Sequence, residues 1–116
     1  MKKAIFRYIS KYEGVSFVEL CNKIDGFSGD LALVNKDYDN IVFWNGLSEE
    51  AGEAINELLK QGLIVIRPTN ILVYIIDGKV PQLPVAKKLR QYKTLKWLPV
   101  ALYTTKSYKK QKGGTK

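Results

Sequence analysis

The chain has 116 residues, of which 46% are hydrophobic, with a formal net charge of +8, a single cysteine (Cys21) and no histidine. This length suits one domain with its own core, and its longest apolar stretch is far shorter than the roughly 18 residues of a membrane span. The lack of histidine and of a second cysteine excludes zinc fingers, disulfide frameworks and His-based catalysis, so we expect a protein that is not an enzyme and uses no cofactor or metal. Arg7, Lys11 and Glu13 interrupt any apolar region of a signal peptide, so we expect a cytoplasmic location.

Two amphipathic helices are predicted at the start of the chain. Residues 2–12 have apolar side chains at the i, i+3, i+4, i+7 spacing of a helix, and Gly14 ends it. These side chains are Ile5, Tyr8, Ile9 and Tyr12. The second helix opens with a capping box formed by Ser16 and Glu19. Cys21 falls on the apolar stripe of this helix, so we expect a small core residue rather than a reactive thiol.

The segment from residue 27 to residue 47 lacks helical periodicity. Short β-type runs at 31–34 and 41–44 flank a polar turn, which predicts a hairpin inserted before the next helix. Ser48 then caps a third helix that carries acidic residues in its first turn, and Gly62 ends it. The predicted buried face of this helix is Ala51, Ala54, Ile55, Leu58 and Leu59.

The order helix, helix, insert, helix, strand, strand predicts an α+β domain of the winged helix-turn-helix class. The two strands, at 63–67 and 71–77, flank the tight turn Pro68-Thr69-Asn70. The three helices would bury their apolar faces together, and this hairpin would be the wing. The same element order also suits unrelated small α+β domains.

The final 35 residues, 82–116, contain ten Lys or Arg and no acidic residue, whereas the first 81 carry a net charge of −2. Such a concentrated positive segment needs a polyanionic partner or solvent. Within it, residues 85–92 are predicted as a short basic helix and residues 98–102 as a strand that packs on the body. From Lys106 onward no apolar periodicity remains, so we expect a disordered tail. The chain thus divides into a winged-helix body, a basic and aromatic extension, and a tail, at residues 1–81, 82–105 and 106–116.

Five stretches spread over nearly the whole chain share their sequence pattern with a known group of proteins. They are Glu13–Phe17, Asn40–Leu47, Val73–Gly78, Leu83–Lys88 and Trp97–Pro99. In these stretches the chain resembles small proteins encoded near replication genes in staphylococcal pathogenicity islands and cassette chromosomes. The resemblance implies a winged-helix single-stranded DNA-binding protein that supports replication of a mobile genetic element.

The third helix, at residues 48–61, would enter the major groove of duplex DNA in an ordinary winged helix. Its exposed positions are four acids and one base, namely Glu49, Glu50, Glu53, Glu57 and Lys60. Phosphates on both sides of the groove would repel such a helix. The long segment between the second and third helices also departs from the usual short turn of about three or four residues. Classical major-groove reading is therefore disfavoured.

Cations outside the third helix are the candidate nucleic-acid-binding residues, together with one aromatic ring. They come from a stripe spaced by four on the first helix, from the ends of the predicted wing, from the extension and from the tail. The candidates are Lys3, Arg7, Lys11, Arg67, Lys79, Lys87, Lys88, Arg90, Tyr92, Lys93, Lys96, Lys109 and Lys110. The helix stripe is equally typical of a solvated face. Cations alternate with flat rings in residues 90–97, which favours single strands because their bases can stack on Tyr92. Trp97 could also stack, although its apolar neighbours favour burial.

These features predict a sequence-tolerant DNA-binding protein that prefers single strands and acts by phosphate neutralisation and base stacking. One alternative is a duplex-binding transcriptional regulator, against which the acidic third helix argues. Another is an adaptor that binds a replication helicase or polymerase through that acidic face, a role compatible with DNA binding. A hydrolase built from carboxylates alone is formally open, but the Asp and Glu residues form no pairing motif.

Overall fold

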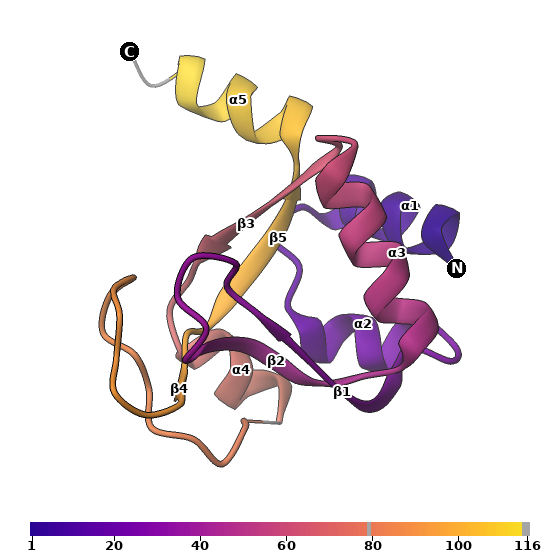
Figure 1. Ribbon diagram of the computed structural model, residues 1–116. Helices are drawn as coiled ribbons and strands as arrows, with labels where there is room; N and C mark the ends of the chain where they lie inside the picture. The colour runs from indigo at the N-terminus through magenta and orange to yellow at the C-terminus, as the bar shows by residue number, and fades with distance from the viewer. Residues whose placement is uncertain (79, 115–116) are drawn as a thin grey trace.

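The computed structural model describes residues 1–78 and 80–114, which form a mixed α+β domain with five helices and five strands (Figure 1). The helices are α1 Lys2–Tyr12, α2 Phe17–Lys23, α3 Glu49–Lys60, α4 Leu72–Asp77 and α5 Thr105–Gly114. The strands are β1 Ser28–Val34, β2 Ile41–Leu47, β3 Ile64–Pro68, β4 Lys96–Trp97 and β5 Val100–Thr104.

The first two predicted helices are confirmed. On α1 the side chains of Ile5 and Ile9 are fully buried, whereas Tyr12, on the same predicted stripe, is 53% exposed. Tyr12 lies in the last turn and packs against the half-buried Tyr8 with the rings tilted and 4.7 Å between their centroids, instead of entering the core. α2 begins after Ser16, whose hydroxyl accepts the predicted capping hydrogen bond from the backbone N–H at position 19.

The predicted hairpin and third helix are also confirmed. β1 and β2 pair antiparallel, and β2 continues the sheet by pairing parallel with the short β4. The Ser48 hydroxyl accepts from the Ala51 N–H at 3.1 Å and so caps α3. α3 buries the predicted face, with Leu59 at its half-buried edge.

The predicted wing hairpin is wrong, because the second predicted strand, at 71–77, is instead the helix α4, which begins at Leu72. The Asn70 side-chain oxygen accepts from the Leu72 N–H at 2.9 Å and starts the helix, and Gly78 ends it in the left-handed conformation. The buried Tyr74 then docks α4 into the core. β3 instead pairs antiparallel with β5, from Ile64 opposite Thr104 to Pro68 opposite Val100.

Two predictions for the C-terminal segment also differ from the structure. Residues 85–92 are an irregular loop and not a helix, because the backbone around Ala86 pairs with Trp97 in extended form. The strand predicted at 98–102 is present as β5 but lies two residues further along the chain, at Val100–Thr104. The chain then continues as α5 through residue 114, where an irregular tail was expected.

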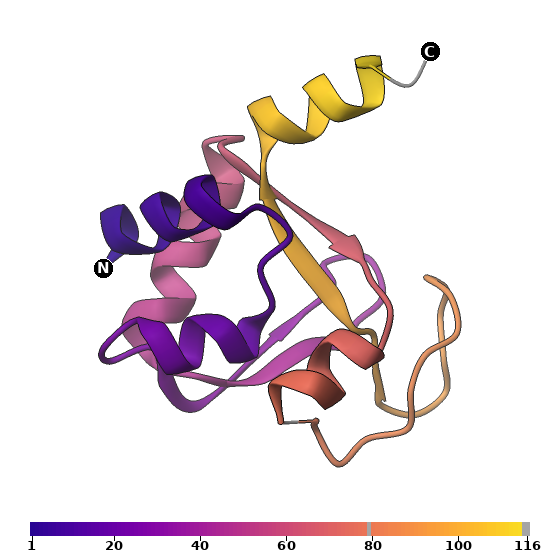
Figure 2. The same cartoon turned by 180° about the vertical axis from the view of Figure 1, so that it is seen from behind.

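Stacked aromatic rings hold the elements together at the centre of the molecule. Phe17 of α2 stacks on Trp44 of β2 at 6.2 Å, Trp44 meets Tyr74 of α4 at 5.6 Å, and Tyr74 meets Trp97 of β4 edge-on at 5.0 Å. Seen from both sides, the β3–β5 ribbon separates α1 from the irregular loop before β4 (Figures 1 and 2). Any cation on α1 and any cation on that loop therefore lie on different surfaces.

Candidate nucleic-acid interface

Residues 85–95, here called the basic loop, carry the largest predicted group of cations. The loop is tied down near its start by a hydrogen bond of 2.8 Å from the Ala86 N–H to the Trp97 carbonyl. Near its end, the Asn40 side-chain amide donates to the Tyr92 carbonyl, also at 2.8 Å. Ala86 is buried, whereas Lys87, Lys88 and Arg90 between the two anchors are exposed, as is Lys93 just after the second anchor. The fold thus presents these charges to solvent on an anchored loop.

Tyr92 organises the basic loop. Its hydroxyl donates to the Lys88 carbonyl at 3.0 Å and accepts from the Lys88 N–H at 3.3 Å. The hydrogen bond donated by the Lys88 backbone N–H lowers the pKa of Tyr92, and the nearby Arg90 charge contributes in the same direction. The Arg90 guanidinium lies 4.2 Å from the ring centroid and the Lys96 ammonium 5.9 Å from it.

The stacking role predicted for Tyr92 therefore changes. Its ring is half-buried, packs against the core, and has Arg90 over one face. The exposed flat surface of the loop is then the Arg90 guanidinium, which can itself stack on a nucleic-acid base. Trp97 is no stacking platform, since it is 1% exposed and its indole N–H donates to the Phe43 carbonyl at 3.1 Å.

A second group of cations lies on β3 and α5. The Arg67 guanidinium lies 4.9 Å from the centroid of the Tyr108 ring, and Tyr108 packs on Tyr103 at 5.3 Å. The Thr104 hydroxyl accepts from the Ser107 N–H at 3.3 Å at the start of α5. Three exposed lysines of α5 follow, namely Lys106, Lys109 and Lys110.

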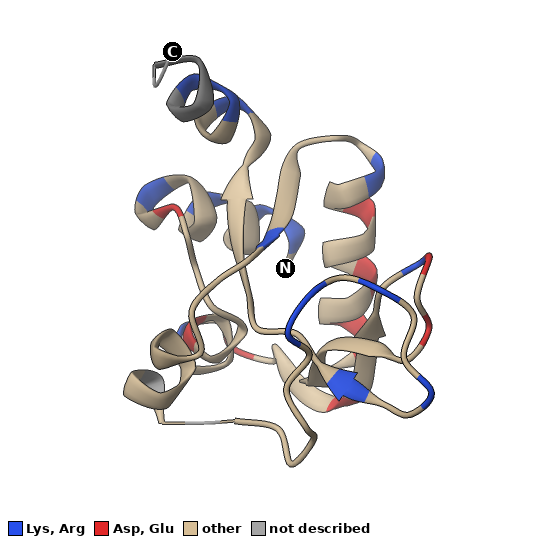
Figure 3. Ribbon diagram, turned by 90° about the vertical axis from the view of Figure 1, so that its left-hand side faces the viewer, with Lys and Arg blue, Asp and Glu red and all other residues tan. Residues whose placement is uncertain are grey.

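In Figure 3 the basic loop and β3 face the viewer, and α3 with its red residues stands to the right of centre, partly behind the loop. Among residues 1–78 and 80–114 one ion pair is found, between the N-terminal ammonium and the Glu50 carboxylate at 3.9 Å. The exposed cations of the basic loop therefore have no carboxylate partner among the described residues.

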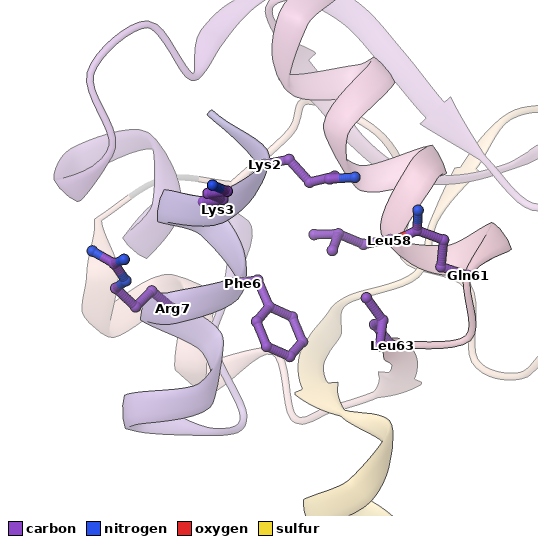
Figure 4. A pocket seen from close by; sticks show the side chains of 7 residues that line it. All are labelled: Lys2, Lys3, Phe6, Arg7, Leu58, Gln61 and Leu63. Carbon is purple, nitrogen blue, oxygen red and sulfur yellow. The ribbon is translucent and has the colours of Figure 1, made fainter.

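The predicted stripe on α1 is confirmed as exposed but lies on another surface, next to a small pocket. Lys3 and Arg7 line this pocket of about 360 Å³ together with Lys2, Phe6 and the amide of Gln61. Two leucines complete it, Leu58 and Leu63. In Figure 4 the Lys2 chain reaches over the apolar floor, whereas the Arg7 guanidinium points away from it. The sequence gives no local signal for this pocket, because its lining residues come from α1 and from the end of α3, which are far apart in the chain.

The last cation of the stripe, Lys11, lies 5.3 Å from the ring centroid of Tyr12 and stays exposed. Lys79, predicted at the end of the wing, lies outside the described residues. The structure thus places the predicted cations in three groups, on the basic loop, on β3 and α5, where Arg67 meets Tyr108, and on α1.

Comparisons with protein-family models, curated proteins and solved structures found no match to this chain. In the part that the structure describes, no helix has the length and apolar character needed to cross a membrane. The same residues contain no cluster of three or more His, Cys, Asp or Glu side chains suited to a metal ion.

Proposed function

We propose that this protein is a non-enzymatic, sequence-tolerant DNA-binding protein with a preference for single strands. The observation that carries the proposal is the set of exposed cations on the basic loop that have no carboxylate partner among the described residues. Arg67 and the lysines of α5 form a further cationic group. Phosphate contacts of this kind bind nucleic acid without reading its sequence. The resemblance described above supports a role in replication of a mobile genetic element in the cytoplasm.

The preference for single strands rests on two features of the surface. The Arg90 guanidinium, held over Tyr92, offers a flat cation on which an unpaired base can stack, and a duplex keeps its bases stacked inside. The acids of α3, Glu49, Glu50, Glu53 and Glu57, are exposed and would be repelled from the major groove of a duplex.

We further propose that the fold is a divergent winged helix in which the wing is made by β3 and β5. Two observations support this arrangement. β3 follows α3 directly, and the far edge of β5 pairs at Leu102 with Val15, which lies between α1 and α2. The segment from 69 to 99, which holds α4 and the basic loop, would then be an insertion between the two wing strands.

A competition assay tests the proposed preference. A labelled oligo(dT) is bound to the full chain and challenged with unlabelled oligo(dT) or with an unlabelled duplex of the same length. We expect the single strand to displace the probe at a lower concentration than the duplex, and all binding to weaken steeply as salt rises. A duplex that competes equally well or better would refute the single-strand preference.

A further inference from the structure

A groove of about 610 Å³ lies between β3 and the end of the β1–β2 hairpin, bordered by the last turns of α3. Four consecutive residues of β3, 64–67, line it on one side, and residues 33–36 of the hairpin line it on the other. Figures 1 and 2 show the hairpin tip beside β3. Within the described residues, β3 pairs with β5 alone and β1 with β2 alone, so both strands that border the groove are edge strands.

The hydrogen-bonding pattern shows which backbone groups of β3 face the groove. The Leu63 carbonyl accepts from the Thr105 N–H at 2.9 Å, so this pair closes the hydrogen-bonded ladder with β5 just before the strand begins. In an antiparallel ladder the next residue points its N–H and C=O the other way. Ile64 and Ile66 therefore direct these groups away from β5, toward an edge on which no described strand lies.

The walls of the groove are apolar. Leu33 of the hairpin, Leu59 of α3 and Ile66 of β3 are half-buried, and Ile64 is almost fully buried. The aromatic ring among the lining residues is Phe43. Burial of alternate apolar side chains against these walls would favour a bound extended chain.

The rim of the groove is cationic. Lys36, Lys60 and Arg67 line it, and no lining residue is acidic. The nearest acids along the chain, Asp37 and Glu57, are exposed and lie outside the lining. The groove thus complements a ligand that combines apolar side chains with negative charge.

We propose that this groove binds an extended, acidic and apolar peptide segment of a partner protein, which adds to β3 as a further strand. A peptide can pair with Ile64 and Ile66 through its own N–H and C=O groups, and at Ile66 it would replace the long hydrogen bond of 3.4 Å that the Arg67 guanidinium donates to the carbonyl. A polynucleotide has no such repeating pair of groups. Single-stranded DNA is also the poorer fit to walls that are mostly aliphatic, because bases prefer flat rings. The proposed surface differs from the basic loop, and Arg67 is the residue that it shares with the cations assigned to DNA binding.

The test uses the full chain and a fluorescein-labelled peptide of about six residues that alternates Val with Glu, the typical length of a strand. Binding is followed by fluorescence anisotropy. We expect this acidic peptide to bind and the same peptide with Lys in place of Glu to bind at least about tenfold more weakly. Equal binding of the two peptides, or none of the acidic one, would overturn the proposal.

Two variants locate the bound peptide. Ile66→Pro removes an N–H that faces the free edge, a change that edge strands tolerate, and should weaken peptide binding about tenfold. The double variant Lys36→Ala/Lys60→Ala removes two rim charges and should weaken it about fivefold at low salt. Lys23→Ala, an exposed lysine of α2 outside the groove, is the matched control and should change nothing.

If Ile66→Pro fails to fold, amide hydrogen exchange of the unsubstituted chain provides a second test. Amide hydrogen exchange at Ile64 and Ile66 should slow when the acidic peptide binds, because the added strand would cover both N–H groups. Unchanged exchange at both amides would overturn strand addition. A loss of oligo(dT) binding in Lys36→Ala/Lys60→Ala without a loss of peptide binding would make the groove a nucleic-acid site instead.

Discussion

Gly29, in β1, is a residue whose missing side chain the fold requires. A Cβ at this position would lie 2.5 Å from the Ser48 Cα and 2.6 Å from the Leu47 carbonyl oxygen. Both are backbone atoms, so no side-chain rotation can relieve the contact. The close approach joins the start of the hairpin to the cap of α3.

Replacement of this glycine should therefore destabilise the fold. We expect Gly29→Ala to lower the free energy of unfolding by about 1–3 kcal/mol, the usual cost of overpacking. Gly52→Ala is the matched control, because a Cβ on this α3 glycine meets nothing within 4 Å and alanine favours a helix by about 0.8–1 kcal/mol. Urea unfolding of both variants checks this, and equal stability of the two would contradict it.

The hydroxyl of Tyr92 should titrate below the ordinary tyrosine pKa of about 10, because the Lys88 backbone stabilises the phenolate. The folded pKa is lowered, so any stability linked to this group is present above the unfolded pKa and is lost as pH falls through the folded one. At neutral pH it contributes nothing. The ultraviolet titration curve of Tyr92→Phe is subtracted from that of the wild type. The difference should show one tyrosine with a pKa below about 10, and a pKa at or above 10 would be inconsistent with the loop geometry.

At the scale of elements, the sequence was sufficient where the determinants are local. Ser16 and Ser48 cap the two helices that they were expected to cap, and the hairpin follows its turn residues. α4 was missed because its run of β-branched residues is typical of a strand, and only a distant contact favours a helix. That contact is Tyr74, the buried residue of α4, while Ile75 and Ile76 remain exposed.

Tyr74 should be essential for the docking of α4. Its hydroxyl donates to the Val100 carbonyl at 2.6 Å and accepts from the Phe17 N–H at 3.1 Å, both in the buried core. Tyr74→Phe would leave these groups unsatisfied, so we expect a loss of about 1–3 kcal/mol in the free energy of unfolding. Tyr12→Phe, at an exposed ring, should change it by less than about 0.5 kcal/mol in thermal or urea unfolding. A Tyr74→Phe variant as stable as the wild type would contradict this role.

α5 should add affinity for DNA without being needed for the fold. A truncation after Thr105 keeps β5 whole and removes five lysines, Lys106, Lys109, Lys110, Lys112 and Lys116. The slope of the logarithm of the affinity for oligo(dT) against the logarithm of salt should become shallower, by at most about 3.5, since each phosphate contact contributes about 0.7. A truncated chain with an unchanged slope would show that α5 does not contact DNA.

At the scale of the whole molecule, the sequence identified the cations but not their grouping. It predicted one basic segment plus an α1 stripe, and the fold places the basic loop and α1 on either side of the β3–β5 ribbon, with α5 at the end of that ribbon (Figures 1 and 2). Arg67 meets Tyr108 of α5, and Lys36 and Lys60 join it around a groove, through contacts between residues far apart in the chain. No local pattern reports such contacts, so the candidate site could be predicted by residue type but not by geometry.

The basic loop has the proposed leading role in DNA binding, and a comparison of two matched triple variants tests this most directly. Each variant removes three exposed cations, Lys87, Lys88 and Arg90 from the loop or Lys3, Arg7 and Lys11 from α1. Affinity for labelled oligo(dT) is measured at one low salt concentration after circular dichroism has shown that both variants fold. We predict that the loop variant binds at least about tenfold more weakly than the α1 variant, since it also loses the stacked guanidinium. An α1 variant that loses as much affinity as the loop variant, or more, would contradict the account.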